Sequence, residues 1–368
     1  MSESEHLSVQ AGQRPTDDVI RRLVQALEAE AVVSMPTETV YGLAARADRP
    51  AALERLATVK GTQDPRPYTW HVGGAEALAG RVALPAMVQR ATARYWPGPL
   101  TLVVRSTAPG LDLITADGWT GVRAPAHAAT SAVLSAAPFP VVMTSANRAG
   151  EAPATDADGV GRTFAAGELA AVLDGGPCAL GEASTVARLG PGGIELLREG
   201  IVTMEEIKRT AGQRLLFVCT GNTCRSPMAE ALARAALRGA LESDDEAQFG
   251  FQIGSAGVYA GPGAPASTHA VEALAERDIP LDDHRSTPAL EALVAEQDRV
   301  YCMTASHREA LLSMLPPGAA DRVELLDPEG EDVPDPFGGS LELYRQTADA
   351  ISRMVDARLS DWVGASPS

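Results

Sequence analysis

Apolar positions in the first half of the chain alternate between helical and strand-like spacing. From Asp17 to Glu30 apolar side chains recur at helical spacing, which predicts an amphipathic helix. The apolar run AVVSMP after it predicts a buried strand that ends at Pro36. The same patterns predict strands at Leu100–Val104, Val141–Met143 and Ala170–Leu173 and helices at Ala51–Val59 and Ala86–Arg94. This mixture indicates an α/β or α+β domain, and we expect residues 1 to about 15 before it to form a flexible tail.

The second half of the chain has a more regular rhythm. The run LLFVC at 215–219 predicts a strand, and SPMAEALARAALRG predicts the helix that follows it. Strand-like FQIGSAG, helix-like HAVEALAERD, strand-like DRVYCM and a C-terminal helix at Leu341–Leu359 continue the order. Alternating strands and helices predict a parallel sheet wrapped by helices.

The boundary between the halves is predicted at Glu205–Arg214, where EEIKRT favours a short helix and AGQR leads into a new strand. The segment LGPGG at 189–193 is instead predicted to be a hairpin turn between ASTVARL and IELLREG. A length of 368 residues favours two domains. We predict them at 15–210 and 213–363, with no internal repeat relating them.

Charge and composition narrow the classes of function. The chain has 31 Lys and Arg against 48 Asp and Glu, a net charge of −17. This balance argues against strong direct nucleic-acid binding, which needs clustered basic residues. A local basic pocket for a small phosphate compound stays compatible with it. Hydrophobic residues make up 45% of the chain, so each half can bury a core.

The few cysteines and the N-terminus indicate the compartment. Four cysteines do not make a disulfide framework, which favours a reducing cytoplasm. The segment MSESEHLSVQ lacks the features of a signal peptide. No run approaches the roughly 18 apolar residues of a membrane helix. We therefore expect a cytoplasmic protein without a membrane partner.

The segment VCTGNTCRSPMAEA at 218–231 places Cys219 and Arg225 in a C-x-x-x-x-x-R loop between a strand and a helix. Backbone N–H groups of such a loop, together with the helix N-terminus, form an anion cradle. The same field favours a nucleophilic thiolate at Cys219. The planar fork of Arg225 can hold two phosphoryl oxygens. The motif is therefore suited to phosphate chemistry.

A buried cysteine before a glycine turn would give the same local pattern. The downstream segment VPDPFGG, with Asp335, favours the catalytic interpretation, because a thiolate that attacks phosphorus needs an acid to protonate the leaving group. By itself, Asp335 is more typical of a turn. The Cys219–Arg225 loop and the Asp335 segment together favour a catalytic site.

These motifs resemble the low-molecular-weight protein phosphatase family over about residues 214–360. The resemblance implies a three-layer α/β fold, with Cys219 as nucleophile, Arg225 as transition-state clamp and Asp335 as general acid and base, and no cofactor. Ser255 in SAG and His284 in DHRS would support the loop beside Asn222 and Ser226. The implied phosphate-binding loop comprises Thr220, Gly221, Asn222, Thr223, Cys224 and Ser226.

The segments CTGNTCRSPMAEAL and DPFGG are most similar to the branch that contains protein-arginine phosphatases. In that branch a Thr at the position of Thr223 favours phosphoarginine. Tyrosine-specific members usually carry a bulkier apolar residue there and an aromatic pair after Asp-Pro, where only Phe337 stands here. Phosphotyrosine and phosphoarginine proteins both stay open as substrates.

The remaining cysteines bear on two other interpretations. An arsenate reductase shares the loop, but its chemistry needs additional resolving cysteines. Cys302 in the apolar strand VYCM is predicted to belong to the core. Cys224 could instead cap an oxidised Cys219 as a disulfide.

The first half contains neither G-x-x-x-x-G-K-[ST] nor G-x-G-x-x-G, so a nucleotide site there has to be built otherwise. Its informative segments are polar strand ends, basic turns and proline loops, and each is ordinary alone. They are MPTETVYGLAA at 35–45, VKGTQDPRPYTWHV at 59–72, WPGPLTLVV at 96–104, GVRAPAH at 121–127, MTSANRAG at 143–150, EASTV at 182–186 and LLREG at 196–200.

In this order they resemble the YrdC-like threonylcarbamoyl-AMP synthase family across about residues 15–210. The resemblance implies a twisted α/β sheet around a large basic concave pocket. In the implied reaction L-threonine and bicarbonate form a carbamate, which attacks the α-phosphorus of ATP and releases pyrophosphate. The product, L-threonylcarbamoyladenylate, serves the t6A modification of tRNA, so tRNA-modifying partner proteins are expected.

The residue types suit that chemistry. Lys60, Arg123 and Arg198 supply cations for a polyphosphate. Mg²⁺ is expected to enter with ATP, carried mainly by the phosphates and with no metal ligand assigned in the chain. His71 falls where the family places a substrate-contacting histidine. Small hydroxyls and amides are expected to orient threonine and nucleotide: Thr37, Ser145, Asn147 and Ser184.

Two positions depart from that family's pattern. The usual K-x-R is Lys60-Gly61-Thr62 here, with Arg66 four positions further on, and SAN continues to Arg148 instead of Ser. Our leading interpretation is a fusion of two enzymes. The alternative is a phosphatase regulated by a noncatalytic, nucleotide-binding YrdC-like module.

Overall fold

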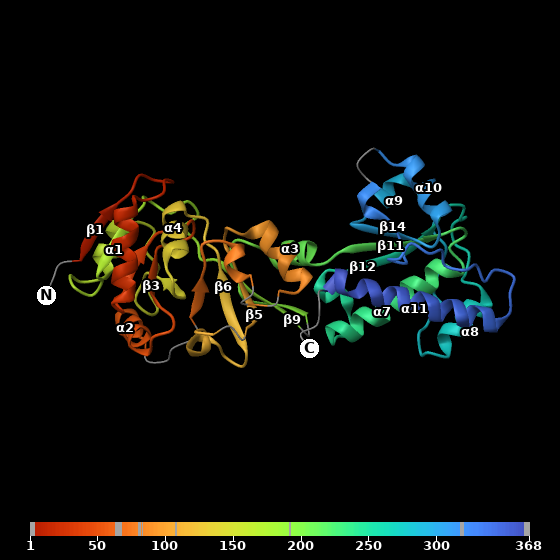
Figure 1. Ribbon diagram of the computed structural model, residues 1–368, viewed down its shortest axis with the longest axis horizontal. Coiled ribbons are helices and arrows are strands. Elements are labelled where there is room, and N and C mark those ends of the chain that lie inside the picture. Colours follow the sequence, from red (N-terminus) through yellow and green to blue (C-terminus); the bar gives the residue numbers. More distant parts are fainter. Residues whose placement is uncertain are drawn as a thin grey trace. The chain divides into compact units, whose positions relative to one another are not determined.

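A mixed sheet of ten strands forms the centre of the first part of the chain in this computed structural model (Figure 1). The structure describes residues 4–62, 68–79, 82, 84–106, 109–190, 193–316 and 320–363. The strand order is β1-β8-β2-β3-β7-β4-β6-β5-β9-β10. The strands are β1 (Glu5–Ser8), β2 (Val33–Met35), β3 (Gly42–Arg46), β4 (Thr69–His71), β5 (Leu100–Arg105), β6 (Trp119–Arg123), β7 (Val141–Ser145), β8 (Ala171–Asp174), β9 (Thr185–Gly190) and β10 (Gly193–Arg198).

Helices pack against this sheet through apolar faces. The helix α1 begins after Thr16, whose hydroxyl accepts a hydrogen bond from the Val19 N–H and caps it. Its buried Leu23 and Leu27 belong to the same core as Val133 of α4. The helices are α1 (Asp17–Glu28), α2 (Pro50–Lys60), α3 (Ala86–Tyr95), α4 (Ala128–Ala136), α5 (Ala157–Thr163) and α6 (Met204–Ala211). Every strand and helix predicted above for this half is confirmed.

The prediction of a flexible N-terminal tail is wrong for Glu5–Ser8. These residues form β1, which pairs in parallel with β8 at the edge of the sheet. Leu7 is buried there, and Glu5 forms an ion pair with Arg22 of α1. A single apolar residue in a polar run gives no recognisable strand pattern. An edge strand such as β1 is stabilised by hydrogen bonds to its neighbouring strand, which the local sequence does not show.

The two strands on either side of LGPGG are β9 and β10, which are neighbours in the sheet. Residues 191 and 192 of the predicted turn lie outside the described residues. The segment EEIKRT forms α6 as predicted. The chain folds into two compact units that change over within this helix, between Ile207 and Lys208.

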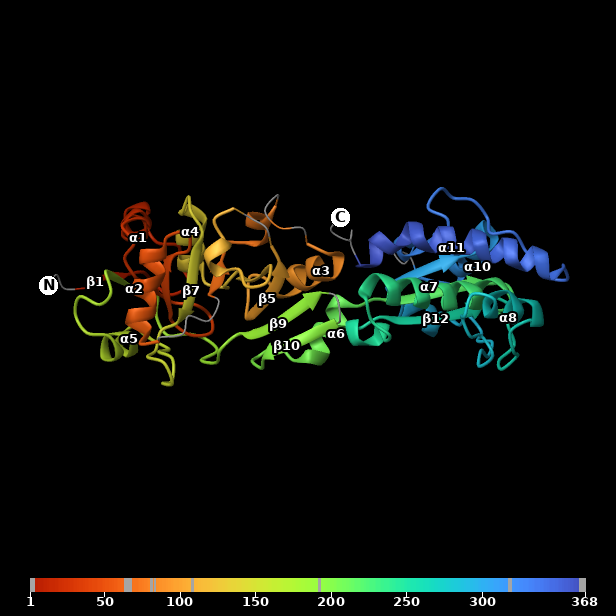
Figure 2. The same cartoon turned by 90° about the horizontal axis from the view of Figure 1, so that it is seen from below.

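A four-stranded parallel sheet forms the second unit, as the sequence rhythm predicts. Its order is β12-β11-β13-β14. The elements are β11 (Arg214–Cys219), β12 (Gln252–Gly257), β13 (Arg299–Cys302), β14 (Val323–Leu325), α7 (Arg225–Leu241), α8 (Thr268–Ala275), α9 (Glu291–Ala295), α10 (Ala305–Met314) and α11 (Leu341–Val363). Figure 1 shows α9 and α10 on one face of this sheet, and α7 and α11 lie side by side on the other (Figure 2).

The core of the second unit contains a cluster of three aromatic rings. Phe217 of β11 stacks on Tyr301 of β13, with ring centroids 5.8 Å apart. The edge of Trp362 in α11 meets Phe217, and its indole N–H donates to the Tyr301 hydroxyl at 2.9 Å. The C-terminal helix is therefore fixed to the two central strands by rings and by a buried hydrogen bond.

The carboxyl ends of β11, β12 and β13 meet at one edge of this sheet, as in any parallel sheet. The chain returns to that edge further on, where the Val333 N–H donates to the Met303 carbonyl at 2.8 Å. Loops from four parts of the chain are thereby brought together. Within the described residues, no helix is both long and apolar enough to cross a membrane.

We expect Trp362→Ala to lower the free energy of unfolding of the second unit by about 3–5 kcal/mol, because it opens a cavity and leaves the buried Tyr301 hydroxyl without its donor. Denaturant titration followed by circular dichroism measures the effect. The control, Trp362→Phe, keeps a ring and should cost less. A loss below about 1 kcal/mol for the alanine variant would contradict this account of the core.

Candidate active sites

Cys219 ends β11 and is only 3% exposed. Its Sγ lies 3.3 Å from the Asn222 backbone nitrogen, which donates to it, and 3.0 Å from the Ser226 Oγ. Asn222 has a φ of 54°, a left-handed conformation that Asn adopts more readily than most residues. The loop thus turns a backbone donor onto the sulfur, which favours negative charge there.

Asn222 is the centre of the network that holds this loop. Its Nδ2 donates to the Ser226 Oγ at 2.9 Å and to the Ser255 Oγ at 2.8 Å. Its carbonyl accepts from the His284 Nε2 at 2.7 Å, and its Oδ1 accepts from the Thr287 N–H at 2.7 Å. The structure therefore brings the predicted supporting residues Ser255 and His284 to the predicted loop.

Arg225 and Asp335 lie on the open side of the loop and are paired with each other. The Arg225 Nη2 lies 2.7 Å from the Asp335 Oδ2. The guanidinium also donates to the Val333 carbonyl at 3.2 Å and to the Thr220 Oγ1 at 3.4 Å. Arg225 is buried, whereas the Asp335 side chain is 50% exposed. An anion that binds to the Arg225 Nη2 on this side therefore has to displace the Asp335 carboxylate.

The other loop residues are fixed by neighbouring segments. Thr220 accepts from the Tyr259 N–H at 2.9 Å, and Thr223 accepts from the Ser267 N–H at 2.8 Å. Gly257 allows this close approach, because a Cβ there would lie 2.6 Å from the Thr220 carbonyl oxygen. The buried Cys224 Sγ lies 3.2 Å from the Tyr344 hydroxyl of α11.

Within the loop, a Cβ added to Gly221 would lie 3.7 Å from the Thr223 Oγ1, so the Thr223 hydroxyl lies close to Gly221.

Cys302 is wholly buried in β13, and burial raises the pKa of its thiol to about 12. The core prediction for Cys302 is therefore confirmed. Its position gives no support to a resolving role.

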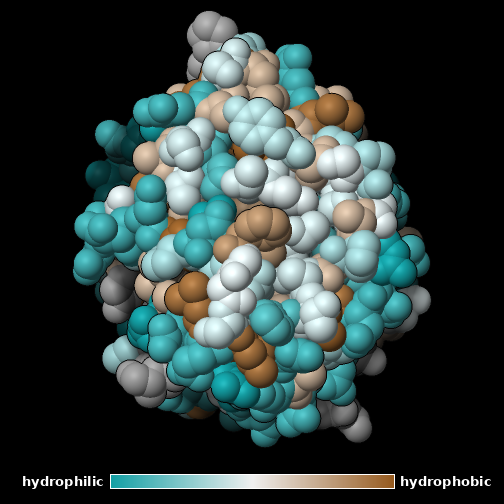
Figure 3. All heavy atoms as spheres, turned by 90° about the vertical axis from the view of Figure 1, so that its right-hand side faces the viewer, coloured by the Kyte–Doolittle hydropathy of each residue, from teal (hydrophilic) through white to brown (hydrophobic). Residues whose placement is uncertain are grey.

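Two aromatic side chains follow the loop segments at this edge and are largely exposed. Tyr259 is 81% exposed and is bonded through its backbone to Thr220, while Phe337 is 78% exposed and its N–H donates to the Asp335 Oδ1 at 3.2 Å. Figure 3 looks onto this end of the unit, where apolar and weakly polar residues gather among hydrophilic ones. Such a rim can hold the non-phosphate part of a substrate.

Sequence reasoning missed three polar residues of this site. The Glu230 carboxylate accepts from the Ser255 hydroxyl at 2.7 Å, Thr287 donates to Asn222, and the His307 Nε2 lies 2.8 Å from the Thr220 Oγ1. Glu230 had a signal, because it follows Ser226 by one helical turn. His307 also had one, because it comes shortly after β13, whose carboxyl end lies beside that of β11.

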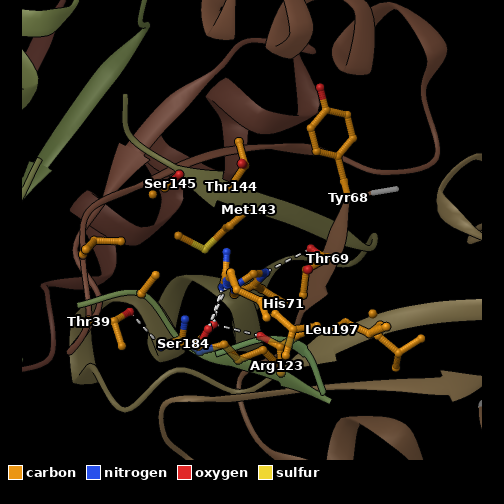
Figure 4. Close-up of a pocket in the computed structure, with 18 of the residues that line it drawn as sticks. Thr39, Tyr68, Thr69, His71, Arg123, Met143, Thr144, Ser145, Ser184 and Leu197 are labelled. Atoms are coloured by element: carbon orange, nitrogen blue, oxygen red, sulfur yellow. Dashed lines mark hydrogen bonds between the residues drawn. The ribbon is translucent and has the colours of Figure 1, made fainter. Parts of the chain in front are cut away.

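In the first unit, a cavity of about 890 Å³ opens on the sheet. His71 of β4, Arg123 of β6 and Ser184 before β9 lie around it from three different segments (Figure 4). The structure brings every residue predicted for this site to the cavity lining: Thr37, Lys60, His71, Arg123, Ser145, Asn147, Ser184 and Arg198. The lining residues that sequence reasoning left unassigned include Thr39, Thr101 and Arg188.

Lys60 ends α2, and its partners among the described residues are neutral oxygens. Its Nζ donates to the Ser145 carbonyl at 2.6 Å, to the Ser145 hydroxyl at 3.1 Å and to the Asn147 Oδ1 at 2.5 Å. Burial lowers the pKa of Lys60 to about 8. In the described part of the chain no carboxylate forms an ion pair with this ammonium group, so its charge is available to a ligand.

Arg198 is held in a similar way. Its guanidinium donates to the Ser184 carbonyl at 2.8 and 3.0 Å and to the Ser184 hydroxyl at 2.9 Å. The Ser184 hydroxyl is also 3.0 Å from the Thr101 Oγ1. Burial lowers the pKa of Arg198, and the charge of Arg123 lowers it further. Arg198 is therefore a half-buried cation held by neutral oxygens, which favours an anion beside it.

Arg123, in contrast, has a carboxylate partner that sequence reasoning missed. Its Nη2 lies 2.6 Å from the Glu38 Oε1 and donates to the Thr39 hydroxyl at 2.9 Å, and both charged side chains are buried. The Ala126 N–H donates to the other Glu38 oxygen at 2.9 Å. Glu38 stands inside the quoted segment MPTETVYGLAA, but nothing local indicates which cation it meets.

His71 is neutral in this environment. Burial, and then the charge of Arg123, lower the pKa of its imidazole to about 3. The Nδ1 lies 3.0 Å from the Thr69 carbonyl, which can only accept, so Nδ1 carries the hydrogen and Nε2 keeps a lone pair. His71 therefore offers an acceptor to a ligand in the cavity.

The two departures from the family pattern have different structural outcomes. Thr62 lines the cavity, and Arg66 lies outside the described residues. Arg148 is directed to the Glu168 carboxylate, at 2.7 and 2.8 Å, and also donates to the Val59 carbonyl. It joins α2 to the segment after α5 instead of contributing a group to the cavity lining.

Comparison with known proteins gives separate matches for the two units. The Sua5/YciO/YrdC family model, whose description is telomere recombination, matches residues 25–200. The low molecular weight phosphotyrosine protein phosphatase model matches residues 214–362.

Individual relatives divide in the same way. The chain is 40% identical to a protein-arginine-phosphatase of Bacillus subtilis over 145 residues, which cover 38% of this chain and 91% of that protein. It is 36% identical to a putative threonylcarbamoyl-AMP synthase of Mycobacterium leprae over 197 residues, which cover 52% of this chain and 88% of that protein. The chain spans about half the length of longer threonylcarbamoyl-AMP synthases that it also matches, 54% and 57% of two of them.

A solved structure of a Pyrococcus abyssi Sua5 variant has a TM-score of 0.51 and 27% identity to the chain, and the match covers 59% of this chain and 71% of that one. The chain covers 91% and 88% of the two relatives above, so the matches identify the family of each unit. The chain belongs to the Sua5/YciO/YrdC family in its first unit and to the low molecular weight phosphotyrosine protein phosphatase family in its second.

Proposed function

We propose that the chain is a bifunctional enzyme whose domains are residues 15–210 and 213–363. The first domain forms L-threonylcarbamoyladenylate from L-threonine, bicarbonate and ATP. The second hydrolyses a phosphoprotein through a cysteinyl-phosphate intermediate. The observation that carries the first activity is the cavity lined by Lys60 and Arg198, two cations whose partners among the described residues are neutral oxygens. The observation that carries the second is the loop after β11, where the Asn222 N–H donates to the Cys219 Sγ and Arg225, paired with Asp335, begins the next helix.

In the synthase domain, the ammonium of Lys60 and the guanidinium of Arg198 bind the phosphates of ATP. Arg123 is neutralised by Glu38, so its role is to shape the wall and to hold Thr39. His71 Nε2 accepts a hydrogen bond from threonine, and Thr37 and Ser184 orient the same substrate. The threonine carbamate then attacks the α-phosphorus, and pyrophosphate leaves as the P–O bond to the β-phosphate breaks.

Mg²⁺ is proposed to enter with ATP. Among the described residues no group of three or more His, Cys, Asp or Glu side chains is placed to hold a metal ion. The cavity lining is rich in hydroxyls, and such a lining fits an ion that is carried mainly by phosphate oxygens. The ion would supply charge neutralisation at the phosphates, while the residues named above position the nucleotide.

In the phosphatase domain, the Cys219 thiolate attacks the phosphorus of the substrate, which binds between the loop amides and Arg225. The phosphate displaces the Asp335 carboxylate from the Arg225 guanidinium. The half-exposed carboxylate then takes up a proton from solvent and, as the acid, donates it to the leaving group. The same carboxylate then accepts a proton from the water that hydrolyses the cysteinyl-phosphate. This order is consistent with an acid that is half-exposed and paired with Arg225 in the structure.

Phosphoarginine is the favoured substrate, with phosphotyrosine as the second candidate. Thr223 places a small polar side chain beside Gly221 in the loop, where an aliphatic side chain would exclude a polar guanidinium. A relative that is 40% identical is a protein-arginine-phosphatase. The exposed rings of Tyr259 and Phe337 can stack on either a guanidinium or a phenyl ring, so they do not decide.

The biological setting follows as a proposal from these activities. We place the protein in the cytoplasm, with tRNA-modifying proteins as partners of the first domain. In the alternative, the first domain binds nucleotide without catalysis and regulates the phosphatase. Release of pyrophosphate that depends on threonine separates the two.

We expect Cys219→Ser to abolish phosphatase turnover and to leave the synthase reaction unchanged, because a serine hydroxyl is a much weaker nucleophile than a thiolate and any phosphoserine it forms is hydrolysed slowly. Phosphate release from a phosphoarginine peptide and pyrophosphate release from ATP are measured on the same preparation. Cys178→Ser, a half-buried cysteine of the first unit, is the matched control and should keep phosphatase turnover. Substantial turnover by Cys219→Ser would remove Cys219 from the role of nucleophile.

We expect Thr223→Ile to shift preference from phosphoarginine toward phosphotyrosine, because a larger apolar side chain would narrow the loop and remove its hydroxyl. The ratio of kcat/KM for the two phosphopeptides is compared before and after substitution. Thr223→Ser, which keeps the hydroxyl, should preserve the preference for phosphoarginine. If the isoleucine variant keeps the wild-type ratio, Thr223 does not set specificity.

We expect the affinity of the first domain for ATP to fall as pH rises above about 8, because burial lowers the pKa of Lys60 to about 8 and this residue must be charged to bind phosphate. Binding favours the protonated form, so affinity is complete below that pKa and falls by up to about tenfold per pH unit above it. Calorimetric titration between about pH 7.5 and about pH 9.5 measures this.

Lys60→Ala is the control for that titration. It should bind ATP roughly 10- to 100-fold more weakly, since it lacks a charged hydrogen-bond donor, and its affinity should not depend on pH in this range. Equal affinity of the wild-type chain at both ends of the range would show that Lys60 does not hold the phosphates.

A further inference from the structure

His307 lies in the first turn of α10 and is 4% exposed. Its ring stands between two threonine hydroxyls: the Nε2 is 2.8 Å from the Thr220 Oγ1, and the Nδ1 is 2.8 Å from the Thr304 Oγ1. Thr304 is the N-cap of α10, and Thr220 is the residue after Cys219. None of the steps proposed above uses this imidazole.

His307 is neutral in the folded protein. Burial lowers the pKa of its imidazole to about 4, and the positive charge of Arg225 acts in the same direction. The carboxylates of Asp335 and Asp332 oppose this shift but are weaker. The neutral ring has one nitrogen that donates and one that accepts.

The hydrogen bonds around Thr220 indicate which nitrogen accepts. Arg225 can only donate, so the Thr220 oxygen accepts from it. The Thr220 hydroxyl hydrogen is then available for the His307 Nε2, and the Nδ1–H donates to Thr304. In this arrangement every donor between Arg225 and Thr304 has an acceptor, and the Thr220 oxygen keeps a lone pair toward the guanidinium.

The direction of the hydrogen bond from the Thr220 hydroxyl to the His307 Nε2 matters when substrate binds. Among the residues that the structure describes, Arg225 has three acceptors: the Asp335 carboxylate, the Val333 carbonyl and the Thr220 hydroxyl oxygen. Once a phosphate replaces Asp335, the Thr220 oxygen and the Val333 carbonyl are the acceptors that remain among the residues described. The Val333 carbonyl is fixed by the backbone, whereas the Thr220 hydroxyl can rotate unless its hydrogen is held.

We propose that His307 is a positioning residue of the phosphatase. It holds the hydrogen of the Thr220 hydroxyl, so that the Thr220 oxygen stays directed at Arg225 and the guanidinium stays aligned for the phosphoryl group. The inference rests on the phosphate-clamp role of Arg225 proposed above. His307 does not touch the reacting atoms and acts through Thr220.

Two substitutions in the full chain separate the two hydrogen bonds of the ring. His307→Gln carries a polar atom close to the position of Nε2 and can still bond Thr220. His307→Asn carries one close to the position of Nδ1 and can bond only Thr304. Ser313→Ala, on the exposed side of the same helix, is the control and should leave turnover unchanged.

Three quantities are measured for each variant: kcat/KM for a phosphoarginine peptide, the calorimetric affinity for inorganic phosphate, and the melting temperature. We expect His307→Asn to lower kcat/KM and phosphate affinity by about tenfold. His307→Gln should restore both to within about threefold of wild type. The melting temperatures of the two variants should be alike.

Equal losses in the Gln and Asn variants, or a lowered melting temperature without a change in phosphate affinity, would overturn the proposal, because a role in capping α10 gives those results. Phosphate affinity needs no turnover. A wild-type chain that binds phosphate with the predicted dependence on His307 but hydrolyses no phosphopeptide would therefore contradict the proposed function and leave this inference supported.

Discussion

Both sites depend on holding a cation out of water while its charge stays available to a ligand. In the first unit Lys60 donates to one carbonyl, one hydroxyl and one amide oxygen, and none of these neutralises it. Burial without a counter-charge is unfavourable, and the lowered pKa of Lys60, about 8, is the sign of that cost. Such a group is kept where an anion binds. The chain's charge of −17 gives no hint of this, because the cationic pocket is local.

The two units meet this constraint in different ways. In the phosphatase, Arg225 is paired with Asp335 at 2.7 Å until a phosphate takes its place. The partner is half-exposed and is the proposed acid, so binding of substrate and release of the acid become one event. In the synthase, Glu38 is buried, accepts from a backbone N–H and is paired with Arg123. Lys60 and Arg198 are the cations proposed to bind the phosphates.

Local sequence was sufficient for much of this description, and long-range contacts account for what it missed. The strand LLFVC, the loop after it and the helix from Arg225 are adjacent in sequence, so their geometry follows from pattern and spacing. The strand Glu5–Ser8 was missed because it is defined by pairing with β8, far along the chain. His307 comes shortly after β13, but its contact with Thr220 spans 87 positions, so its partner could not be identified from the local sequence. The partner of Arg123 is likewise 85 positions away in Glu38.

The claim that the first unit is an enzyme, and not a nucleotide-binding regulator, is tested most directly by pyrophosphate release. The full chain is incubated with ATP, with L-threonine and bicarbonate present together or omitted one at a time, and pyrophosphate is quantified. The account predicts pyrophosphate in the complete mixture, in step with the threonine consumed, and only background when either substrate is missing. ATP binding without any pyrophosphate release in the complete mixture would contradict it.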